Sequence, residues 1–379
     1  GRQGEATLDA KGRVVAVELP GVYALSVTYD ADGRPVTLTQ GTGALARVAQ
    51  FGYATNGYLR VVTNGRGERV ELRLDAIGRV TNVVLADDGV IGLRYDRSED
   101  VVGVTPPGRE EHALGYDGME QITHYAPPAA GTATNAQSWT YNLNRQLTGV
   151  VRPDGTVLTN LYDPQGRLAV AAWPGERVSV SYDGQSRVSG VTATTGASVG
   201  YSYDGFLLTN VTVSGPGAAG QLGYAYNADL WLTNLAVNGV SVGYDRDSDG
   251  LLTRAGELLL NRRADNGFLT NTVLGNLRDE LAYNGFGELT NFSATYGGTN
   301  LLSVGYGHDL LGRITSRVET IQGETTVYGY SCDVRGQLVQ VTTNGAVYSL
   351  YAYDANGNRT NAVVAGDQRA RSTTPRTGC

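Results

Sequence analysis

Two serine motifs are the first candidates for chemistry in this sequence. Gly196–Gly200 and Gly239–Gly243 both match Gly-x-Ser-x-Gly, the pattern of a nucleophile elbow. Such an elbow needs a sharp turn from a strand into a helix. Ser198 and Ser241 instead precede alternating tyrosine segments, so we expect both serines to lie within β-strands. In a glycine-rich chain such matches arise by chance, and we predict no catalytic serine.

Histidine and cysteine are too few for most site chemistry. The three histidines, at 112, 124 and 308, show no His-Glu-x-x-His or other paired spacing. His308 and Cys332 occupy equivalent positions and could approach each other, but a metal site needs more ligands than this pair offers. The other cysteine, Cys379, cannot build a disulfide framework with Cys332 alone. We therefore predict no catalytic residues, no metal, no cofactor and no enzymatic activity.

An internal repeat of about 21 residues explains most of the remaining polar residues. Tyr29-Asp30-Ala31-Asp32-Gly33-Arg34 recurs along the chain, with Leu replacing Tyr in some copies. The residues that define the repeat, which we predict to be structural, are Tyr29, Asp30, Gly33, Asp75, Gly78, Tyr162, Asp163, Gly166, Tyr203, Asp204, Tyr283, Gly287, Asp309, Gly312, Asp333, Gly336, Tyr353, Asp354 and Gly357.

Each copy reads as a β-hairpin. The Asp side chain can hydrogen-bond the backbone two residues on and open a turn, and the following Gly supplies a positive φ. Second turns, such as Asn64-Gly65 and Asn238-Gly239, fall about halfway between these turns. The sequence therefore predicts an all-β fold of tandem hairpins in a long antiparallel sheet that curves or spirals. Residues 1–365 would form one continuous array of about 17 hairpins, and residues 366–379 a disordered tail.

Two side-chain patterns suggest how neighbouring hairpins pack. Paired tyrosines, as in Tyr201-Ser202-Tyr203, share one face, and stacked from hairpin to hairpin they would form an aromatic ladder. A recurring Leu-Thr-Asn, as at Leu208-Thr209-Asn210, could place asparagines in a hydrogen-bonded ladder. A solvated edge position is the alternative reading of these asparagines.

Composition and charge exclude several classes of protein. The net charge of −7 argues against nucleic-acid binding, which requires a basic face. No apolar stretch is long enough to span a membrane as a helix. The turn aspartates do not follow the nine-residue period of calcium-binding β-rolls, and no blade signature marks a propeller. The chain starts at Gly1 without a visible signal peptide, so we expect a fragment of a longer protein.

The Tyr-Asp-x-x-Gly-Arg-Leu pattern closely resembles the YD repeats of the RHS family over roughly residues 5–365. That family includes bacterial polymorphic toxins, shell subunits of insecticidal toxin complexes, wall-associated proteins and animal teneurins. The resemblance implies a ribbon of hairpins that forms a partial RHS-type shell. The self-cleaving carboxylates of the family's shell-closing core have no counterpart in this sequence, so no catalytic residue is carried over.

Two functions follow from this resemblance. The first is a non-catalytic scaffold, the shell segment of a secreted or cell-surface protein that encloses its own C-terminal cargo or toxin domain. The second is an adhesin that binds carbohydrate or a partner cell through the exposed sheet face, because aromatic and planar polar groups also recognise sugars. We expect neither a nucleic acid nor a membrane span to be involved.

Overall fold

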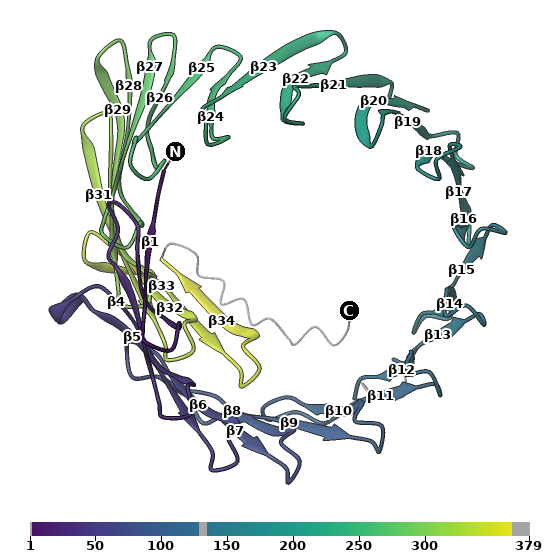
Figure 1. The fold of residues 1–379 in the computed structure, drawn as a ribbon, viewed down its shortest axis with the longest axis horizontal. Helices are drawn as coiled ribbons and strands as arrows, with labels where there is room; N and C mark the ends of the chain where they lie inside the picture. The colour runs from purple at the N-terminus through teal and green to yellow at the C-terminus, as the bar shows by residue number, and fades with distance from the viewer. Residues whose placement is uncertain (1, 129–134, 366–379) are drawn as a thin grey trace. The chain divides into compact units, whose positions relative to one another are not determined.

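The fold is a long series of β-hairpins. The structure, a computed structural model, describes residues 2–128 and 135–365. It contains a sheet of 34 strands, in which antiparallel pairs form between strands that follow each other along the chain (Figure 1). The predicted all-β fold of tandem hairpins is thereby confirmed. The expected disordered tail lies outside the described residues.

The strands are short and evenly spaced. The first half comprises β1 (Glu5–Leu8), β2 (Val14–Glu18), β3 (Leu25–Tyr29), β4 (Pro35–Gln40), β5 (Arg47–Tyr53), β6 (Leu59–Thr63), β7 (Arg69–Leu74), β8 (Val80–Val84), β9 (Val90–Tyr95), β10 (Val101–Thr105), β11 (His112–Tyr116), β12 (Ile122–Ala126), β13 (Gln137–Tyr141), β14 (Leu147–Val151), β15 (Val157–Tyr162), β16 (Leu168–Trp173) and β17 (Glu176–Tyr182). The second half comprises β18 (Val188–Ala193), β19 (Ser198–Asp204), β20 (Leu207–Ser214), β21 (Gly220–Tyr226), β22 (Leu232–Val237), β23 (Val240–Arg246), β24 (Leu252–Ala255), β25 (Leu258–Arg262), β26 (Leu269–Leu274), β27 (Leu277–Tyr283), β28 (Leu289–Tyr296), β29 (Thr299–His308), β30 (Ile314–Ile321), β31 (Glu324–Cys332), β32 (Leu338–Thr343), β33 (Ala346–Tyr353) and β34 (Arg359–Val364). A 3-10 turn, Gly43–Leu45, lies between β4 and β5.

The strands belong to two compact units. The first unit contains residues 1–94, 105–110 and 257–379, and the second contains residues 95–104 and 111–256. Strands β1 to β8 and β25 to β34 therefore lie in the first unit, and β11 to β24 in the second. The first unit is assembled from two stretches that are far apart in the sequence.

The repeat turns are closed by their aspartates. At Asp309 the side-chain oxygen Oδ1 accepts hydrogen bonds from the backbone N–H groups of Leu311 (2.8 Å) and Arg313 (3.1 Å). The backbone N–H of Gly312 donates to the carbonyl of Asp309, and Gly312 has a φ of 79°. A residue with a Cβ is strained at this φ, which explains the glycine. The same backbone bonds recur at Asp30, Asp75, Asp163, Asp333 and Asp354.

The arginine that ends several of the repeat turns has a role that the sequence did not reveal. In the turn at Asp30, the Arg34 Nε donates to Asp30 Oδ2 (2.8 Å), while the guanidinium lies 4.7 Å from the ring centre of Tyr53 in the next repeat. The Tyr53 hydroxyl donates in turn to the carbonyl of Pro35 (2.8 Å). Arg13 and Tyr29, Arg167 and Tyr182, and Arg187 and Tyr203 repeat this arrangement.

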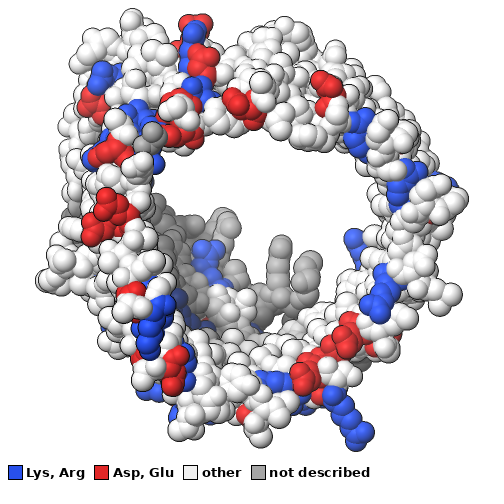
Figure 2. Space-filling view, viewed as in Figure 1, with Lys and Arg blue, Asp and Glu red and all other residues white. Residues whose placement is uncertain are grey.

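These contacts replace the expected Tyr-on-Tyr ladder at four positions. Each tyrosine ring lies against a cation that is itself paired with a carboxylate, so aspartate, arginine and tyrosine link one repeat to the next. Basic and acidic side chains are accordingly intermixed on the face displayed in Figure 2.

The core is thin, as a chain with modest apolar content predicts. The side chains of Val170, Val211, Val304 and Val341 are buried, and each lies within a strand. Register places Tyr201 opposite Val211 on one face, and Gly200 opposite Thr212 on the other. Stability must therefore accumulate from many small contacts between neighbouring hairpins.

Two local expectations are not met. Asp204 does not open a repeat turn of the common kind, because it ends β19 and pairs with Leu207 across a two-residue turn. The Leu-Thr-Asn asparagines do not form a ladder with one another. The Asn210 side chain accepts from Gln221 Nε2 (2.8 Å), and Asn234 Nδ2 donates to Ser241 Oγ (3.3 Å). These bonds are local and join neighbouring strands.

Both serine motifs lie in strands, as expected. Ser198 begins β19, and its Oγ lies 2.7 Å from Ser214 Oγ on β20. Ser241 lies in β23. Neither serine is at a strand-to-helix turn, so neither has the geometry of a nucleophile elbow.

Removing the hydroxyl of Tyr203 is expected to destabilise the second unit by about 1 kcal/mol, because the variant Tyr203→Phe leaves the Val188 carbonyl without its donor. Chemical denaturation followed by tyrosine fluorescence measures the change. Tyr201→Phe is the matched control, since within the described residues its hydroxyl makes no hydrogen bond. Equal losses in the two variants would contradict the assigned role of the hydroxyl.

Candidate functional site

Hairpin tips from the two ends of the chain meet within the first unit. We call this set of contacts the seam. The residues joined across it are 241 to 246 positions apart at four contacts. The seam pairs Pro20 with Asn266, Tyr23 with Gly285 and Phe286, Arg47 with Glu288, Arg66 with Asp309, Asp87 with Arg335, and Arg109 with Asp354. Tips of residues 20–109 thus contact tips of residues 263–358.

The centre of the seam is a two-pronged ion pair. The Arg47 NH1 and NH2 groups donate to Glu288 Oε1 and Oε2 at 2.7 and 2.8 Å. Both side chains are only 19% exposed, so solvent screens the pair weakly. Hydrogen bonds from Arg47 lower the pKa of Glu288, against the opposing effect of burial. The planar guanidinium also lies 3.7 Å from the ring centre of Phe286, which makes Arg47 the most connected residue of the seam.

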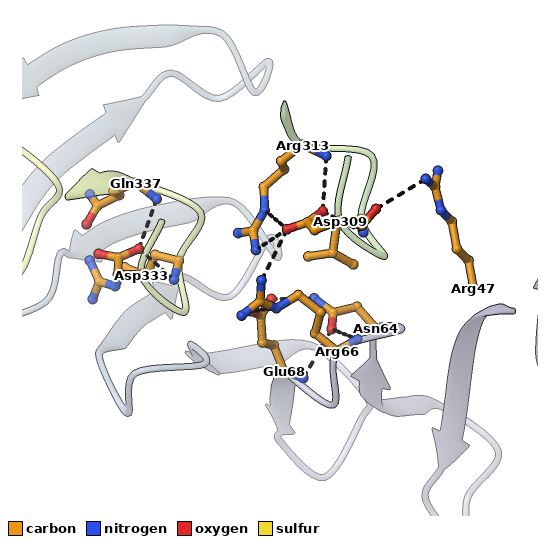
Figure 3. Close-up of polar contacts among 10 residues, drawn as sticks. Arg47, Asn64, Arg66, Glu68, Asp309, Arg313, Asp333 and Gln337 are labelled. Carbon is orange, nitrogen blue, oxygen red and sulfur yellow. Dashed lines mark hydrogen bonds and ion pairs between the residues drawn. The ribbon is translucent and has the colours of Figure 1, made fainter. Parts of the chain in front are cut away.

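Asp309 serves both its own turn and the seam (Figure 3). Its Oδ2 accepts from Arg313 Nε (2.8 Å) in the same turn and from Arg66 NH1 (3.1 Å) across the seam. Burial would raise the pKa of Asp309, but the hydrogen bonds from Arg313 and Leu311 outweigh it and lower the pKa to about 2. The carboxylate is therefore charged at any physiological pH, and Arg66 is held by a permanent anion.

Aromatic contacts accompany the ion pairs. The rings of Tyr23 and Phe286 meet edge to face, with centres 4.8 Å apart. The backbone N–H of Tyr23 donates to the carbonyl of Gly285 (2.5 Å). A Cβ on Gly285 would come within 2.4 Å of the Tyr23 ring. The two tips therefore approach so closely that a larger residue at position 285 would displace the Tyr23 ring.

A cavity of about 690 Å³ opens at the seam. Its walls include the aromatic side chains of Tyr23, Phe286 and Tyr306, together with Arg47 and Arg66. Both arginines are already paired with carboxylates. The positive charges of the cavity wall are therefore balanced by the carboxylates with which they pair, and these ion pairs join the hairpin tips.

His308 also lines this cavity and lies close to Glu288. Its Nδ1 lies 3.8 Å from Glu288 Oε2, and the side chain is 10% exposed. Cys332, the other residue that sequence placed at an equivalent position, is a partly buried free thiol. Among the described residues, no group of three or more His, Cys, Asp or Glu side chains is arranged to hold a metal. Cys379 lies outside the described residues.

The predicted repeat residues divide into two groups. Asp309, Gly312 and Asp354 reach the seam, where a Cβ on Gly312 would meet Glu288 Oε1 at 2.5 Å. Gly287 also lies at the seam, where a Cβ would come 3.6 Å from the Val22 side chain. Others, such as Asp30 and Tyr203, serve their own hairpin or the contact with a neighbouring repeat. The remaining seam residues were missed because the Tyr, Asp and Gly positions of the repeat do not include them; they are Pro20, Tyr23, Arg47, Arg66, Asp87, Arg109, Asn266, Gly285, Phe286, Glu288 and Arg335.

Comparison with known proteins agrees with this architecture. The model of the family described as Teneurin YD-shell matches residues 5–370. Teneurin-3 of Mus musculus is 21% identical over an alignment of 374 positions, which covers 89% of this chain and 13% of that protein. Teneurin-3 of Danio rerio is 24% identical over an alignment of 392 positions, which covers 89% of this chain and 14% of that protein.

A solved structure shows the same fold. The crystal structure of TcdB2-TccC3 without its hypervariable C-terminal region matches with a TM-score of 0.56 at 15% identity, covering 96% of this chain and 24% of that chain. The chain thus spans a small part of each protein that it resembles. The structure contains, in its described portion, no helix of sufficient length and apolarity to cross a membrane. The family match over most of the sequence confirms the YD-repeat resemblance, and this chain belongs to the Teneurin YD-shell family, a family of structural shell domains.

Proposed function

We propose that this chain is a wall segment of a shell that encloses a downstream domain of the same polypeptide, outside the cell or at its surface. The seam is the observation that carries the proposal. Its contacts join tips far apart in the sequence, four of them between residues 241 to 246 positions apart, so the hairpin array is held against itself instead of ending in free tips. A wall that excludes proteases from a cargo needs such lateral contacts.

The similarity to TcdB2-TccC3 supports the proposal that the shell encloses a downstream domain. That protein is described as having a hypervariable C-terminal region, which was absent from the crystal structure. A constant wall with a variable downstream region is the organisation that encapsulation requires. The acting part of such a protein is the cargo, and the wall contributes binding and exclusion without catalysis.

Protease protection tests this function in the full-length protein. We expect the domain downstream of the repeats to resist trypsin under native conditions, and to be cleaved rapidly when it is expressed alone. Mass spectrometry of the time course identifies the fragments. Equal cleavage rates in the two settings would show that the wall encloses nothing.

Glycan binding through the repeat tyrosines has no support in this geometry. Tyr29, Tyr53, Tyr182 and Tyr203 each lie against an arginine and donate their hydroxyl to a backbone carbonyl. A ring that already packs in this way on one side, with its hydroxyl occupied, is a structural contact between hairpins.

A further inference from the structure

Two turns of the chain share a pattern that differs from the common repeat turn. Asn64-Gly65-Arg66-Gly67-Glu68 and Asn284-Gly285-Phe286-Gly287-Glu288 both read Asn-Gly-x-Gly-Glu, and the pattern occurs twice in the sequence. Both turns lie at the seam, and residues of both line the same cavity. We call them the Asn-Glu turns. The common turn carries Asp and Arg at the corresponding ends.

The exchange of end residues changes the charge of the turn. In a common turn, such as that of Asp30 and Arg34, the two charges neutralise each other at 2.7 Å. In the Asn-Glu turns, a neutral amide donates to the glutamate instead, at 2.7 Å from Asn64 to Glu68 and 2.8 Å from Asn284 to Glu288. The turn keeps its internal hydrogen bond, but the residue at its other end no longer balances the glutamate charge. A cation at a different position must then pair with the glutamate.

The structure shows where each cation comes from. Glu288 receives Arg47 from the other side of the seam. Glu68 receives Arg66 from its own turn (3.2 Å), and the same guanidinium reaches across to Asp309. Glu68 and Glu288 are 12% and 19% exposed. Each mostly buried glutamate therefore fixes an arginine that joins the two stretches.

The first glycine of each Asn-Glu turn admits the opposing tip. A Cβ on Gly285 would overlap the Tyr23 ring, so this glycine is required by the opposing tip. A Cβ on Gly65 would make only ordinary van der Waals contacts, among them one of 3.6 Å with the Leu310 carbonyl oxygen. Neither glycine has a positive φ, so backbone conformation does not require it. Common turns carry a larger residue at this place, for example Ala31, Ala76 or Pro164.

We infer that the Asn-Glu turns set the register of the seam, that is, which hairpin tips of one stretch face which tips of the other. A register rule is needed because the repeats are alike, so a slip by one repeat would still bring tips together. Such a slip would move Arg47 from Glu288 to the corresponding residue of the next turn, Arg313, which already pairs with Asp309 and offers no anion. In the opposite direction the corresponding residue is Phe268, which offers no charge.

Converting an Asn-Glu turn into a common turn tests this inference. The double variant Asn284→Asp with Glu288→Arg recreates the Asp and Arg pairing of the other hairpins, so the β27–β28 hairpin is expected to stay folded. The Tyr23 amide, which donates to Gly285 across the seam, reports on closure. We expect its hydrogen exchange to accelerate at least tenfold. Adding Arg47→Glu, which offers an anion to the arginine introduced at position 288, is expected to recover most of the protection.

A matched control exists in the second unit. Asn142 and Gln146 end a turn in which Nδ2 donates to Oε1 at 2.8 Å, and Asn142→Asp with Gln146→Arg introduces the same Asp and Arg end residues away from the seam, starting from a neutral pair. This control is expected to leave the Tyr23 exchange unchanged. The inference is overturned if the seam variant keeps Tyr23 protected, or if the triple variant exchanges as fast as the double one while strand amides stay protected.

The inference rests on the scaffold part of the proposed function and not on the cargo. If the downstream domain is not protected from protease but the Tyr23 exchange behaves as expected, the enclosed cargo is contradicted and the seam register is supported. If the domain is protected but the Tyr23 exchange does not change, the enclosing wall is supported and the register inference is contradicted.

Discussion

Replacing Gly285 by alanine is expected to destabilise the first unit by about 2 kcal/mol, the usual cost of forcing extra volume into a tight contact. The added Cβ would lie 2.4 Å from the Tyr23 ring, a distance that real Cβ atoms do not tolerate. Tyr23 must then move, and its hydrogen bond to the Gly285 carbonyl and its contact with Phe286 are lost together. Denaturant unfolding combined with hydrogen exchange of residues 20–25 measures the effect.

Gly184 provides the matched control. It follows Asp183 at the same place in its turn as Gly285 follows Asn284, and a Cβ there would meet nothing within 4 Å. Because its φ also suits an L-residue, Gly184→Ala is expected to leave stability unchanged or to raise it by about 0.5 kcal/mol. If Gly184→Ala lowers the stability of the second unit as much as Gly285→Ala lowers that of the first, close approach at the seam does not explain the glycine at position 285.

The fold could be predicted because its rules are local. An Asp such as Asp309 caps the turn that it opens, and a Gly such as Gly312 adopts the φ that the turn needs, so a few residues determine each hairpin. Antiparallel pairing of consecutive strands then follows from short turns alone. Asp204 shows the limit of the pattern, since the loss of one residue from its turn gives a different and tighter turn.

The seam could not be predicted by the same reasoning. Each hairpin is rotated slightly relative to the one before it, and these rotations add up over about ten repeats to determine which tips meet. A local sequence pattern does not encode the total rotation. Arg47 and Arg66 look like ordinary surface residues in the sequence. One signal was present, because Glu288 stands where the repeat favours Arg, and Gly285 where common turns carry Ala or Pro. A charge reversal inside a regular repeat, next to an unneeded glycine, indicates a contact outside the repeat.

Acid is expected to weaken the seam selectively. The pKa values of Asp87, Glu288, Asp309 and Asp354 are all lowered from their ordinary values; hydrogen bonds from Arg47 are the main cause at Glu288, and at the three aspartates hydrogen bonds outweigh the effect of burial. A carboxylate with a lowered pKa adds stability above its unfolded pKa and loses it as the pH falls through its folded pKa. The seam should therefore be complete above pH of about 5 and weaken towards pH 2.

The pKa of the Asp309 carboxyl indicates how much stability the seam loses in acid. A pKa of about 2, against an ordinary value of 3.8, corresponds to at most about 2.5 kcal/mol at neutral pH. Partial exposure reduces this figure, although the side chain is only 12% exposed. We expect the free energy of unfolding of the first unit to fall between pH 4.5 and 2, and hydrogen exchange at Tyr23 to accelerate over the same interval.

The variant Asp309→Asn separates the seam from general acid unfolding. It keeps a side-chain oxygen to cap its turn, as Asn284 does in its own turn, but removes the charge that holds Arg66. Its stability at pH 7 should be lower, and its dependence on pH between 4.5 and 2 should be flatter than that of the unaltered protein. Asp204→Asn, at an exposed turn of the second unit, should leave the curve of the first unit unchanged. If the stability of Asp309→Asn depends on pH in parallel with that of the unaltered protein, a group other than Asp309 is responsible for the acid sensitivity. The asparagine cannot be protonated in this range, so the variant lacks any contribution from titration at position 309.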